Sequence, residues 1–545
     1  MPRNGGAIGK LNSVNFAGIP LMCSCITAGY MNADPRTSKQ QEHKAVWLLC
    51  LAAAIHVFIF CAAFPVFNQV DEGCHFDLVV RYSHGELPRG LQPMCRESSL
   101  YLLTYRSPEF MSRTQDFPDG HYPVPFWRQP GAAQTQAERR NAAIEKAASD
   151  WQSLEKLPVW TNYQASQPPL YYSIAGVWWR AGRWLGMTGL WLVFWLRFLN
   201  VAFVTALVWT GYRAAREVFP EQIFFTLGVP ALIAFIPQQA FYSIQNDVLS
   251  PLCFGIAFIF LMRLWRAETP GLALGAATGL AMAATFLAKL TNAPLLAVSA
   301  AFIALKILRL HKGGALRRSL PALLSLVAFA AVPALAWLTR TKIAFGDWTG
   351  SAAKLQFITW TLKPLDQWLH HPIFTPHGVW TFISDLASSF WQGSEIRWHD
   401  NPLDLPAADA VYVILTLSLV ILAVLSLLVR AVPMTDFQRT MLWFGLACLS
   451  AGAAFLAFLS VIYDFGLCLD PSREHPYLAE GRLILGALIP FLLIYLCGLN
   501  YLLRNLQNRL GGASALAAII LFMLASEIAA DRAIFSSQYN WYHLF

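Results

Sequence analysis

The sequence predicts an all-α polytopic membrane protein, and three observations carry that prediction. Hydrophobic residues make up 56% of the 545 residues and charged residues 13%, which leaves too little polar surface for a soluble globular protein. Long apolar runs recur from about residue 46 to about residue 530, each near the roughly 20 residues that a helix needs to cross a membrane. The sequence does not show the short alternating strands of a membrane β-barrel.

The apolar runs predict about eleven transmembrane helices. Their approximate bounds are 46–66, 191–212, 223–243, 248–264, 270–288, 293–310, 320–340, 409–429, 441–462, 483–503 and 514–530. Lys and Arg recur in every second short loop, as Arg213 and Arg216, Arg263 and Arg266, Lys312 with Arg317 and Arg318, Arg430 and Arg439, and Arg504 and Arg509. Such loops are typically cytoplasmic. Because these anchors largely account for the net charge of +8, we expect no nucleic-acid partner.

This orientation divides the chain into five parts. Residues 1–45 form a mostly disordered cytoplasmic tail, residues 46–340 a transmembrane module with an external loop at 67–190, and residues 341–408 a second external loop. Residues 409–530 supply the C-terminal transmembrane helices, interrupted by an external connection at about 463–482, and residues 531–545 lie outside. The first apolar run lacks a small-residue cleavage site, so we expect it to be retained as a span.

The first external loop has the composition of a folded cap. Residues 135–151 have the pattern of a surface helix, and the aromatic run that follows Gln167-Pro168-Pro169-Leu170-Tyr171-Tyr172 predicts a helix lying along the membrane interface. Cys74 and Cys95 both fall outside the spans, which leaves open whether they form a disulfide. Aromatic residues of this loop suit either sugar stacking or packing of the cap.

Asp71 and Glu72, followed by His75, directly succeed the first span. Paired acids at the mouth of a helix bundle are typical of an ion site or a catalytic base, although His75 alone is more often structural. On the same predicted face, Asn246-Asp247 suits either a tight turn or a ligand contact. Lys289 and Arg482 are external cations, which suit either interfacial snorkelling or binding of an anion such as phosphate.

Glycosyl transfer from a lipid-phosphate sugar is a reaction that would use both the acids and the cations. Outside the cytoplasm no nucleotide sugars are available, so a donor has to be carried on a polyprenyl phosphate at headgroup level. Cations would stabilise the departing phosphate, and a carboxylate would take the proton of the acceptor hydroxyl.

The chain also resembles the GT-C superfamily of polytopic glycosyltransferases, which includes protein O-mannosyltransferases and aminoarabinose transferases. Asp71-Glu72 after the first span is similar to the superfamily's acidic motif, and Gln167 to Tyr172 resembles its Pro-Pro-Leu-Tyr-Tyr segment. Asp-Glu-x-x-His followed by Tyr82-x-x-Gly85-x-x-Pro88 looks like a largely uncharacterised bacterial subfamily, with Val70 in place of the usual Pro and Leu483 in place of Tyr.

The resemblance implies a bacterial cytoplasmic (inner) membrane enzyme whose active site faces outside. Asp71 would be the base of an inverting displacement, Glu72 its positioning neighbour, and Lys289 with Arg482 the phosphate clamp. The predicted substrate-binding residues are His75, Gln167, Tyr171, Tyr172, Asn246, Asp247, Lys289, Glu480 and Arg482. The expected partners are a polyprenyl-phosphate sugar donor, a glycan, lipid or protein acceptor, and membrane lipids.

Metal dependence and two rival functions stay open at this point. We expect no required cofactor, although Asp71, Glu72, His75, Asp77 and Asp247 have the oxygen and nitrogen atoms that Mg²⁺ or Mn²⁺ accepts. A transporter or flippase of lipid-linked sugars is the main alternative, but its internal repeats and mid-span acids are not evident. A non-catalytic partner in envelope polysaccharide synthesis is the other.

Overall fold

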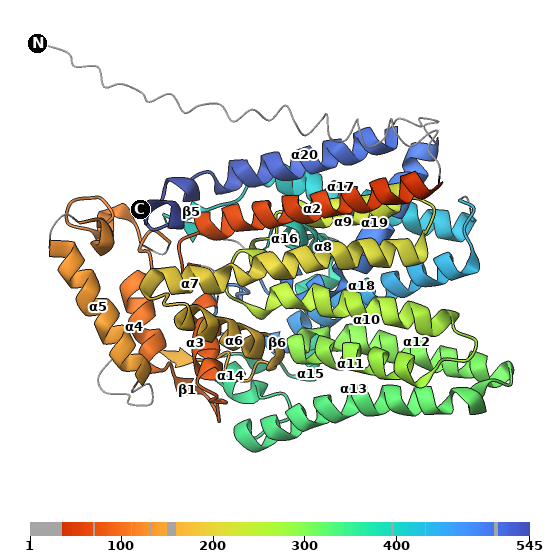
Figure 1. Ribbon diagram of the computed structural model, residues 1–545, viewed down its shortest axis with the longest axis horizontal. Helices are drawn as coiled ribbons and strands as arrows, with labels where there is room; N and C mark the ends of the chain where they lie inside the picture. The colour runs from red at the N-terminus through yellow and green to blue at the C-terminus, as the bar shows by residue number, and fades with distance from the viewer. Residues whose placement is uncertain are drawn as a thin grey trace, which may run out of the picture.

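The computed structural model is a long bundle of helices. It describes residues 35–68, 71–110, 112–129, 132–149, 160–393, 397–399, 401–430, 432–505 and 511–544. The bundle helices are α2 (Pro35–Ala63), α7 (Gly189–Arg197), α8 (Leu199–Val218), α9 (Ile223–Ala234), α10 (Leu249–Arg266), α11 (Leu272–Ala288), α12 (Ala293–Lys312), α13 (Leu316–Phe345), α17 (Pro406–Val429), α18 (Asp436–Ile462), α19 (Leu488–Asn505) and α20 (Gly511–Asp531). Figure 1 shows them running side by side along one axis.

The predicted class of an all-α polytopic membrane protein is confirmed. Within the described residues, nine helical segments are long and apolar enough to span a membrane, and α9 and α11 are shorter apolar helices. Each predicted span coincides with one of these segments. The predicted span 223–243 is helical only to Ala234, because Pro237 follows and Pro disfavours helical geometry in the residue before it.

The remaining elements are short and gather mainly at one end of the bundle (Figure 1). The helices are α3 (Glu72–Ser83), α4 (Arg96–Tyr105), α5 (Ala132–Ser149), α6 (Leu170–Trp184), α14 (Ser351–Phe357), α15 (Leu365–Trp368) and α16 (Pro376–Gln392). Three antiparallel pairs join β1 (Gln92–Pro93) to β2 (Thr161–Asn162), β3 (Thr361–Leu362) to β6 (Tyr463–Asp464), and β4 (Arg397–Trp398) to β5 (Asn401–Pro402).

Single turns of 3₁₀ helix complete the chain path. They are η1 (Thr114–Asp116), η2 (Phe126–Arg128), η3 (Gln239–Phe241), η4 (Asn246–Val248), η5 (Leu290–Asn292), η6 (Pro372–Phe374), η8 (Ile534–Ser536) and η9 (Trp541–His543), with a longer 3₁₀ segment at η7 (Gly481–Ala487). The predicted surface helix at 135–151 is present as α5, and the helix predicted after Gln167 to Tyr172 is present as α6, which packs on α3.

Local sequence explains where several helices begin. Thr435 caps α18 by accepting a hydrogen bond from the backbone N–H of Gln438, whose side chain accepts from the Thr435 N–H in return. Thr375 caps α16 by accepting a hydrogen bond from the Gly378 N–H, with Pro376 in the first turn. Pro406 likewise opens α17. These signals fix where α16, α17 and α18 begin.

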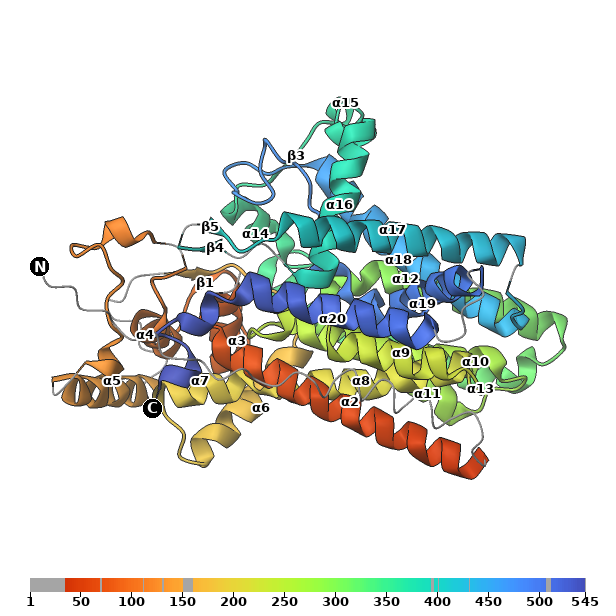
Figure 2. The same ribbon diagram turned by 90° about the horizontal axis from the view of Figure 1, so that it is seen from above.

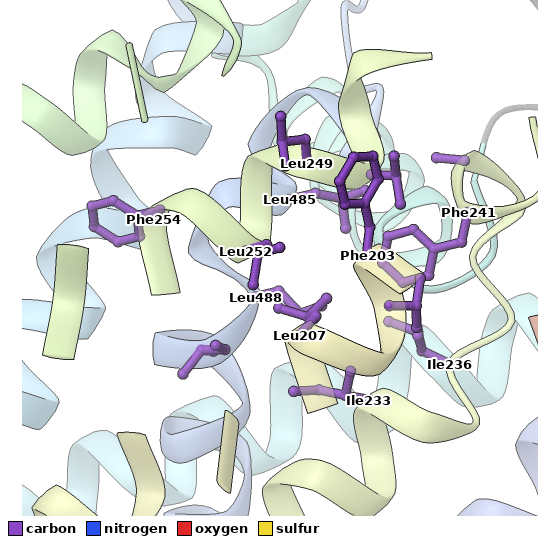
Figure 3. Close-up of a cluster of buried hydrophobic side chains, with 14 of the residues drawn as sticks. Phe203, Leu207, Ile233, Ile236, Phe241, Leu249, Leu252, Phe254, Leu485 and Leu488 are labelled. Atoms are coloured by element: carbon purple, nitrogen blue, oxygen red, sulfur yellow. The ribbon is translucent and has the colours of Figure 1, made fainter. Parts of the chain in front are cut away.

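The centre of the bundle is a tightly packed apolar core. Figure 3 shows side chains from α8, α9, α10, η7 and α19 pointing toward one another. They include Phe203, Leu207, Ile233, Leu252, Leu485 and Leu488. In a lipid environment such contacts stabilise the bundle through close packing, because the lipid chains are as apolar as the side chains.

Helices α11 and α13 approach each other through small residues. Gly275 and Gly279 are four residues apart on α11, and a Cβ at either position would collide with the backbone oxygen of Ala322 or Leu326 on α13. This is the small-residue spacing that lets membrane helices pack backbone to backbone.

Arginine residues from the predicted cytoplasmic loops meet at one end of the bundle. Arg263 and Arg266 at the end of α10 both bind Glu217 of α8, with the shortest contact at 2.7 Å, and Arg266 also covers the ring of Phe437 at the start of α18. Arg216 lies 3.1 Å from His43 of α2. The basic loops therefore share one end, opposite α3 and α6 (Figure 1).

The structure bears on the predicted N-terminal tail and on the possible disulfide between Cys74 and Cys95. Residues 1–34 of the predicted tail lie outside the described residues, and from Pro35 the chain is already helical in α2, about ten residues ahead of the predicted span. Cys74 and Cys95 are free, buried thiols. Cys95 Sγ lies 2.9 Å from Ser98 Oγ.

A buried polar cluster attaches the last helix to the bundle. Glu527 of α20 binds His56 of α2 at 2.7 Å and accepts a hydrogen bond from the Tyr242 hydroxyl, while the other ring nitrogen of His56 lies 3.0 Å from the Ala234 carbonyl. All these groups are buried. The cluster supplies a polar anchor for a helix whose remaining surface faces mostly outward.

Replacement of Glu527 by leucine is expected to destabilise the protein. It leaves the His56 nitrogen and the Tyr242 hydroxyl without a hydrogen-bond partner, and each buried unpaired group lowers the free energy of unfolding by about 1–3 kcal/mol. Thermal unfolding in nanodiscs measures the effect. Ile528→Ala, at a 45% exposed position of the same helix, is the control and is expected to shift the free energy of unfolding by less than about 0.5 kcal/mol. Equal effects of the two variants would contradict the anchoring role.

Candidate active site

Asp71 has an unusual backbone conformation. It is the residue that precedes α3, and its φ of 65° and ψ of −4° are left-handed. For a residue other than glycine such geometry costs about 1–3 kcal/mol, and it is found preferentially at functional sites. Phe67, just after α2, is left-handed as well, with φ of 63°. The two positions bend the connection between α2 and α3, so that Asp71 and Glu72 have entirely different neighbours.

The Asp71 carboxylate is held by three groups. Tyr163 donates a hydrogen bond to Oδ1, Gln164 donates one to Oδ2 at 2.8 Å, and the Arg482 guanidinium lies 3.9 Å from Oδ2. The side chain is 13% exposed, so it remains accessible. Burial alone would raise the pKa of Asp71, but the charges of Arg482 and Lys354 and the hydrogen bond from Tyr163 outweigh it and hold this pKa below its ordinary value. Asp71 is therefore ionised at neutral pH.

A chain of amide side chains connects this carboxylate to the transmembrane helices. Gln164 Oε1 accepts hydrogen bonds from Gln167 at 2.8 Å and from Lys354 of α14 at 3.0 Å. Gln167 in turn accepts one from Asn246 at 3.2 Å, and Asn246 also donates to the Ala288 carbonyl at 2.9 Å. The predicted residues Gln167 and Asn246 therefore reach Asp71 through Gln164, which bonds both Gln167 and Asp71.

Glu72 lies apart from this accessible group, although the sequence placed it beside Asp71 at the reacting centre. It is fully buried and forms a bidentate ion pair with Arg197 of α7 at 2.7 and 2.8 Å. It also accepts hydrogen bonds from the backbone N–H groups of Phe67 at 2.8 Å and Ile244 at 3.0 Å. These contacts occupy both oxygens, so Glu72 holds α3, α7 and the segment before α10 together.

The two predicted cations have different surroundings. Lys289 is buried and forms an ion pair with Asp247, so its charge is already matched. Arg482 is near Asp71 and also contacts Glu480 at 3.3 Å and Gln245 at 3.4 Å. Of the two, Arg482 is the one that lies beside the accessible carboxylate.

His75, Tyr171 and Tyr172 form a buried aromatic group near Asp71. The Tyr172 hydroxyl lies 2.6 Å from His75 Nδ1, the two rings are nearly parallel, and Tyr171 packs edge-on against Tyr172. Burial, more than any neighbouring charge, lowers the pKa of His75 to about 4. His75 is therefore neutral at neutral pH and supports the site through packing and one hydrogen bond.

Comparison with known proteins identifies the family. A model described as "Predicted membrane protein (DUF2142)" matches residues 54–464, about three quarters of the chain. The protein belongs to this family. The match runs from the first span through α18, so it contains Asp71, Lys289 and Lys354. No curated protein matches the DUF2142 chain.

Solved structures similar to this DUF2142 protein include the oligosaccharyltransferase of Archaeoglobus fulgidus. Its apo form has 12% identity and a TM-score of 0.39, with 89% of this chain and 56% of that chain covered. The complex with Zn and sulfate has 13% identity, a TM-score of 0.39, and coverage of 89% and 53%. The AglB complex with an inhibitory peptide and a dolichol-phosphate has 12% identity and a TM-score of 0.37, with 89% of this chain and 56% of that chain covered. The chain therefore spans about half the length of these proteins.

Four residues at the site of this DUF2142 protein were missed by the sequence analysis. Tyr163 and Gln164 carry no motif of their own, although they directly precede the Gln167 to Tyr172 segment. Lys354 is one of four Lys or Arg residues in the predicted external loop at 341–408, and no motif distinguishes it. Arg197 had a usable signal, because an arginine inside an apolar run is rare and typically has a buried partner.

The acids near the site do not form a shared set of metal ligands. Among the described residues, no three His, Cys, Asp or Glu side chains gather in a way that fits a metal ion. Each acid has its own donors instead: Glu72 has Arg197, Asp247 has Lys289, and Asp77 has Arg81 at 3.0 Å. The arrangement in the described part of the chain does not fit a Mg²⁺ or Mn²⁺ ion held between these carboxylates.

Proposed function

We propose that this protein is a GT-C-type glycosyltransferase of the bacterial cytoplasmic membrane. It moves a sugar from a polyprenyl-phosphate donor to a glycan, lipid or protein acceptor of the cell envelope, on the extracytoplasmic face. The observation that carries the proposal is Asp71: an ionised, accessible carboxylate in a left-handed conformation, with Arg482 and Lys354 close by. The motif resemblance of Asp71-Glu72 and Gln167 to Tyr172 supports the same conclusion.

The proposed reaction is a single inverting displacement. The oxygen of the acceptor hydroxyl attacks the anomeric carbon while the bond from that carbon to the phosphate oxygen breaks, and the electron pair of that bond leaves with the phosphate. Asp71 takes the hydroxyl proton as general base. Arg482 and Lys354, which approach Asp71 from η7 and α14, stabilise the charge of the departing phosphate.

The other predicted site residues hold and orient the groups that act on the substrate. Glu72 fixes the backbone next to Asp71, and Asp247 orients Lys289 at the edge of the site. His75, Tyr171 and Tyr172 form the buried aromatic group near it. Glu480 contacts Nε of Arg482 and so holds the guanidinium beside Asp71.

The proposed orientation rests on the distribution of arginines. Arg216, Arg263 and Arg266 meet at the end of the bundle opposite α3 and α6. Because basic loops stay in the cytoplasm, the end with Asp71 faces outward.

The test is a transfer assay with purified protein in lipid nanodiscs. A panel of radiolabelled polyprenyl-phosphate sugars is offered together with an extract of envelope lipids, glycans and proteins. Appearance of label in an acceptor supports the proposal. Binding or transbilayer movement of lipid-linked sugars without transfer across the whole panel contradicts it and favours the flippase.

The pH dependence of transfer tests the electrostatic part of the site. Asp71 works as a base only when ionised, so the rate falls as the pH drops through its pKa, which neighbouring cations hold below the ordinary value. Removing the Lys354 charge raises that pKa. The acid limb of the kcat/KM profile of Lys354→Ala is therefore expected to shift to higher pH, whereas Lys342→Ala, an exposed lysine elsewhere, leaves it unchanged. An unshifted limb in Lys354→Ala would contradict this coupling.

A further inference from the structure

The elements α15, α16 and η6 project sideways from the bundle at the level of the membrane helices. Figure 2 shows α15 and α16 standing out from the side of the bundle beside α17 and α18, with α16 running across the direction of the spans. The ring of Trp368 on α15 packs against Phe458 of α18 at 6.0 Å. Phe458 precedes the end of that span by four residues, or about 6 Å at 1.5 Å per residue. This region therefore lies at the depth of the lipid headgroups.

The projecting region exposes an unusual amount of apolar surface. Leu365 of α15 and Leu369 just after it are 73% and 80% exposed, and Leu467 and Leu469 after β6 are 83% and 86% exposed. Leucines that stand out singly from a protein surface need no explanation, but a group of four around one pair of short strands is typical of a membrane contact. Lipid chains of the same leaflet are the apolar medium available at this depth.

Two open cavities adjoin the β3–β6 pair. One has a volume of about 310 Å³ and is lined by Lys363, His370, Asp464 and Arg473, among others. The other has a volume of about 410 Å³ and is lined mostly by apolar groups, including Leu355 of α14 and Leu362 of β3. Tyr463 lines both cavities, so they adjoin across a single side chain. The polar cavity suits the charged headgroup of a lipid, and the adjoining apolar cavity suits its acyl chain.

The polar cavity has cationic groups available for an anion. Among the described residues, Lys363 Nζ forms no hydrogen bond, and its charge interacts with that of Asp464 in the same cavity. Arg473 contacts Asp464 through Nε at 2.8 Å, which leaves the four N–H donors of its two terminal nitrogens. His371 is not available, because one ring nitrogen accepts from the Ile373 N–H at 3.1 Å and the other lies 3.0 Å from the Pro476 carbonyl.

We propose that the two cavities bind one phospholipid of the adjacent leaflet, with its phosphate on Lys363 and Arg473 and an acyl chain across Tyr463 in the apolar cavity. The exposed leucines at α15 and of the segment after β6 dip into the same leaflet. The apolar cavity shares helix α14 with the proposed transfer centre at Asp71, since Leu355 lines the cavity and Lys354 of the same helix bonds Gln164. The lipid is bound here without being consumed.

Photo-crosslinking tests this proposal without any sugar donor present. The protein is placed in nanodiscs that contain phosphatidylethanolamine with a diazirine near the head of one acyl chain, and the labelled peptides are mapped. Label is expected in residues 361–374 and 463–476. Joint replacement Lys363→Ala with Arg473→Ala is expected to lower it about tenfold or more, since charge-assisted hydrogen bonds to the phosphate are lost. Lys342→Ala, an exposed cation at the end of α13, is the matched control and keeps the label.

A second variant covers the case in which the double replacement perturbs the fold. Leu365→Asn with Leu369→Asn changes only exposed side chains, and it is expected to reduce the same label while thermal stability is retained. Equal labelling of wild type and both variants would overturn the proposal. Loss of label on addition of inorganic phosphate at the lipid's own concentration would also overturn it, because the cavity would then be a site for soluble anions.

Discussion

Asp71→Asn is expected to abolish transfer while leaving the protein folded and able to bind donor. Loss of a general base costs about 10²- to 10⁴-fold in kcat. Asparagine is the suitable replacement, because it tolerates the left-handed backbone that Asp71 adopts and keeps a polar side chain toward Tyr163 and Gln164. The measurement is single-turnover transfer of a radiolabelled sugar in nanodiscs, with donor binding measured separately on the same preparation.

Asp119→Asn is the control for this experiment. Asp119 is an exposed acid of the same external loop, far along the chain from the Asp71 network, so the replacement removes an equal charge and is expected to leave kcat within about twofold. If Asp71→Asn retains a rate similar to that of the control, a different group takes the proton. Normal transfer by wild type together with loss in both variants would point to a general charge requirement of the external loop and would contradict the assignment of the base.

The sequence was a good guide to the membrane architecture for a physical reason. A span has to satisfy its own backbone hydrogen bonds in lipid and present apolar side chains, so its length and composition are readable without tertiary contacts. All eleven predicted spans therefore coincide with helical segments, and the early end of α9 follows from Pro237. The external elements depend on contacts between distant residues, and of these the sequence indicated α5 and α6.

Residues of the candidate site could be predicted from sequence when their residue type and place in the chain were distinctive. Residues that reach the site only through the fold could not. The sequence singled out Asp71 as an acid directly after the first span and Arg482 as an external cation, and the two side chains lie 3.9 Å apart. Adjacent residues, however, need not share surroundings: the left-handed turn at Asp71 sends Glu72 to Arg197, 125 positions away in the sequence. Lys354, 190 positions from Gln164, reached the site through the fold alone.

The ion pair of Glu72 with Arg197 is expected to be the most important buried interaction for stability. Arg197 bonds both carboxylate oxygens and also donates to the carbonyls of Cys61 at 3.2 Å and Pro65 at 3.1 Å. Arg197→Ala leaves a fully buried carboxylate unpaired, which costs about 3–5 kcal/mol. Since native stabilities lie near 5–15 kcal/mol, much of this variant is expected to be recovered unfolded or aggregated, as measured by size-exclusion yield and by thermal unfolding in nanodiscs.

Two further variants distinguish the loss of a buried ion pair from the loss of an arginine charge alone. Arg263→Ala removes an arginine whose contact with Glu217 is 2.7 Å long but partly exposed, and its cost is expected to be about 0–1 kcal/mol. Joint replacement Glu72→Leu with Arg197→Leu removes both charges together and is expected to recover stability relative to Arg197→Ala, because no unpaired charge remains. Transfer activity is expected to stay low in this double variant even where folding recovers, since Glu72 no longer binds the N–H of Phe67 and the left-handed turn before Asp71 loses its support. Recovery of both stability and full activity would show that the pair serves folding alone.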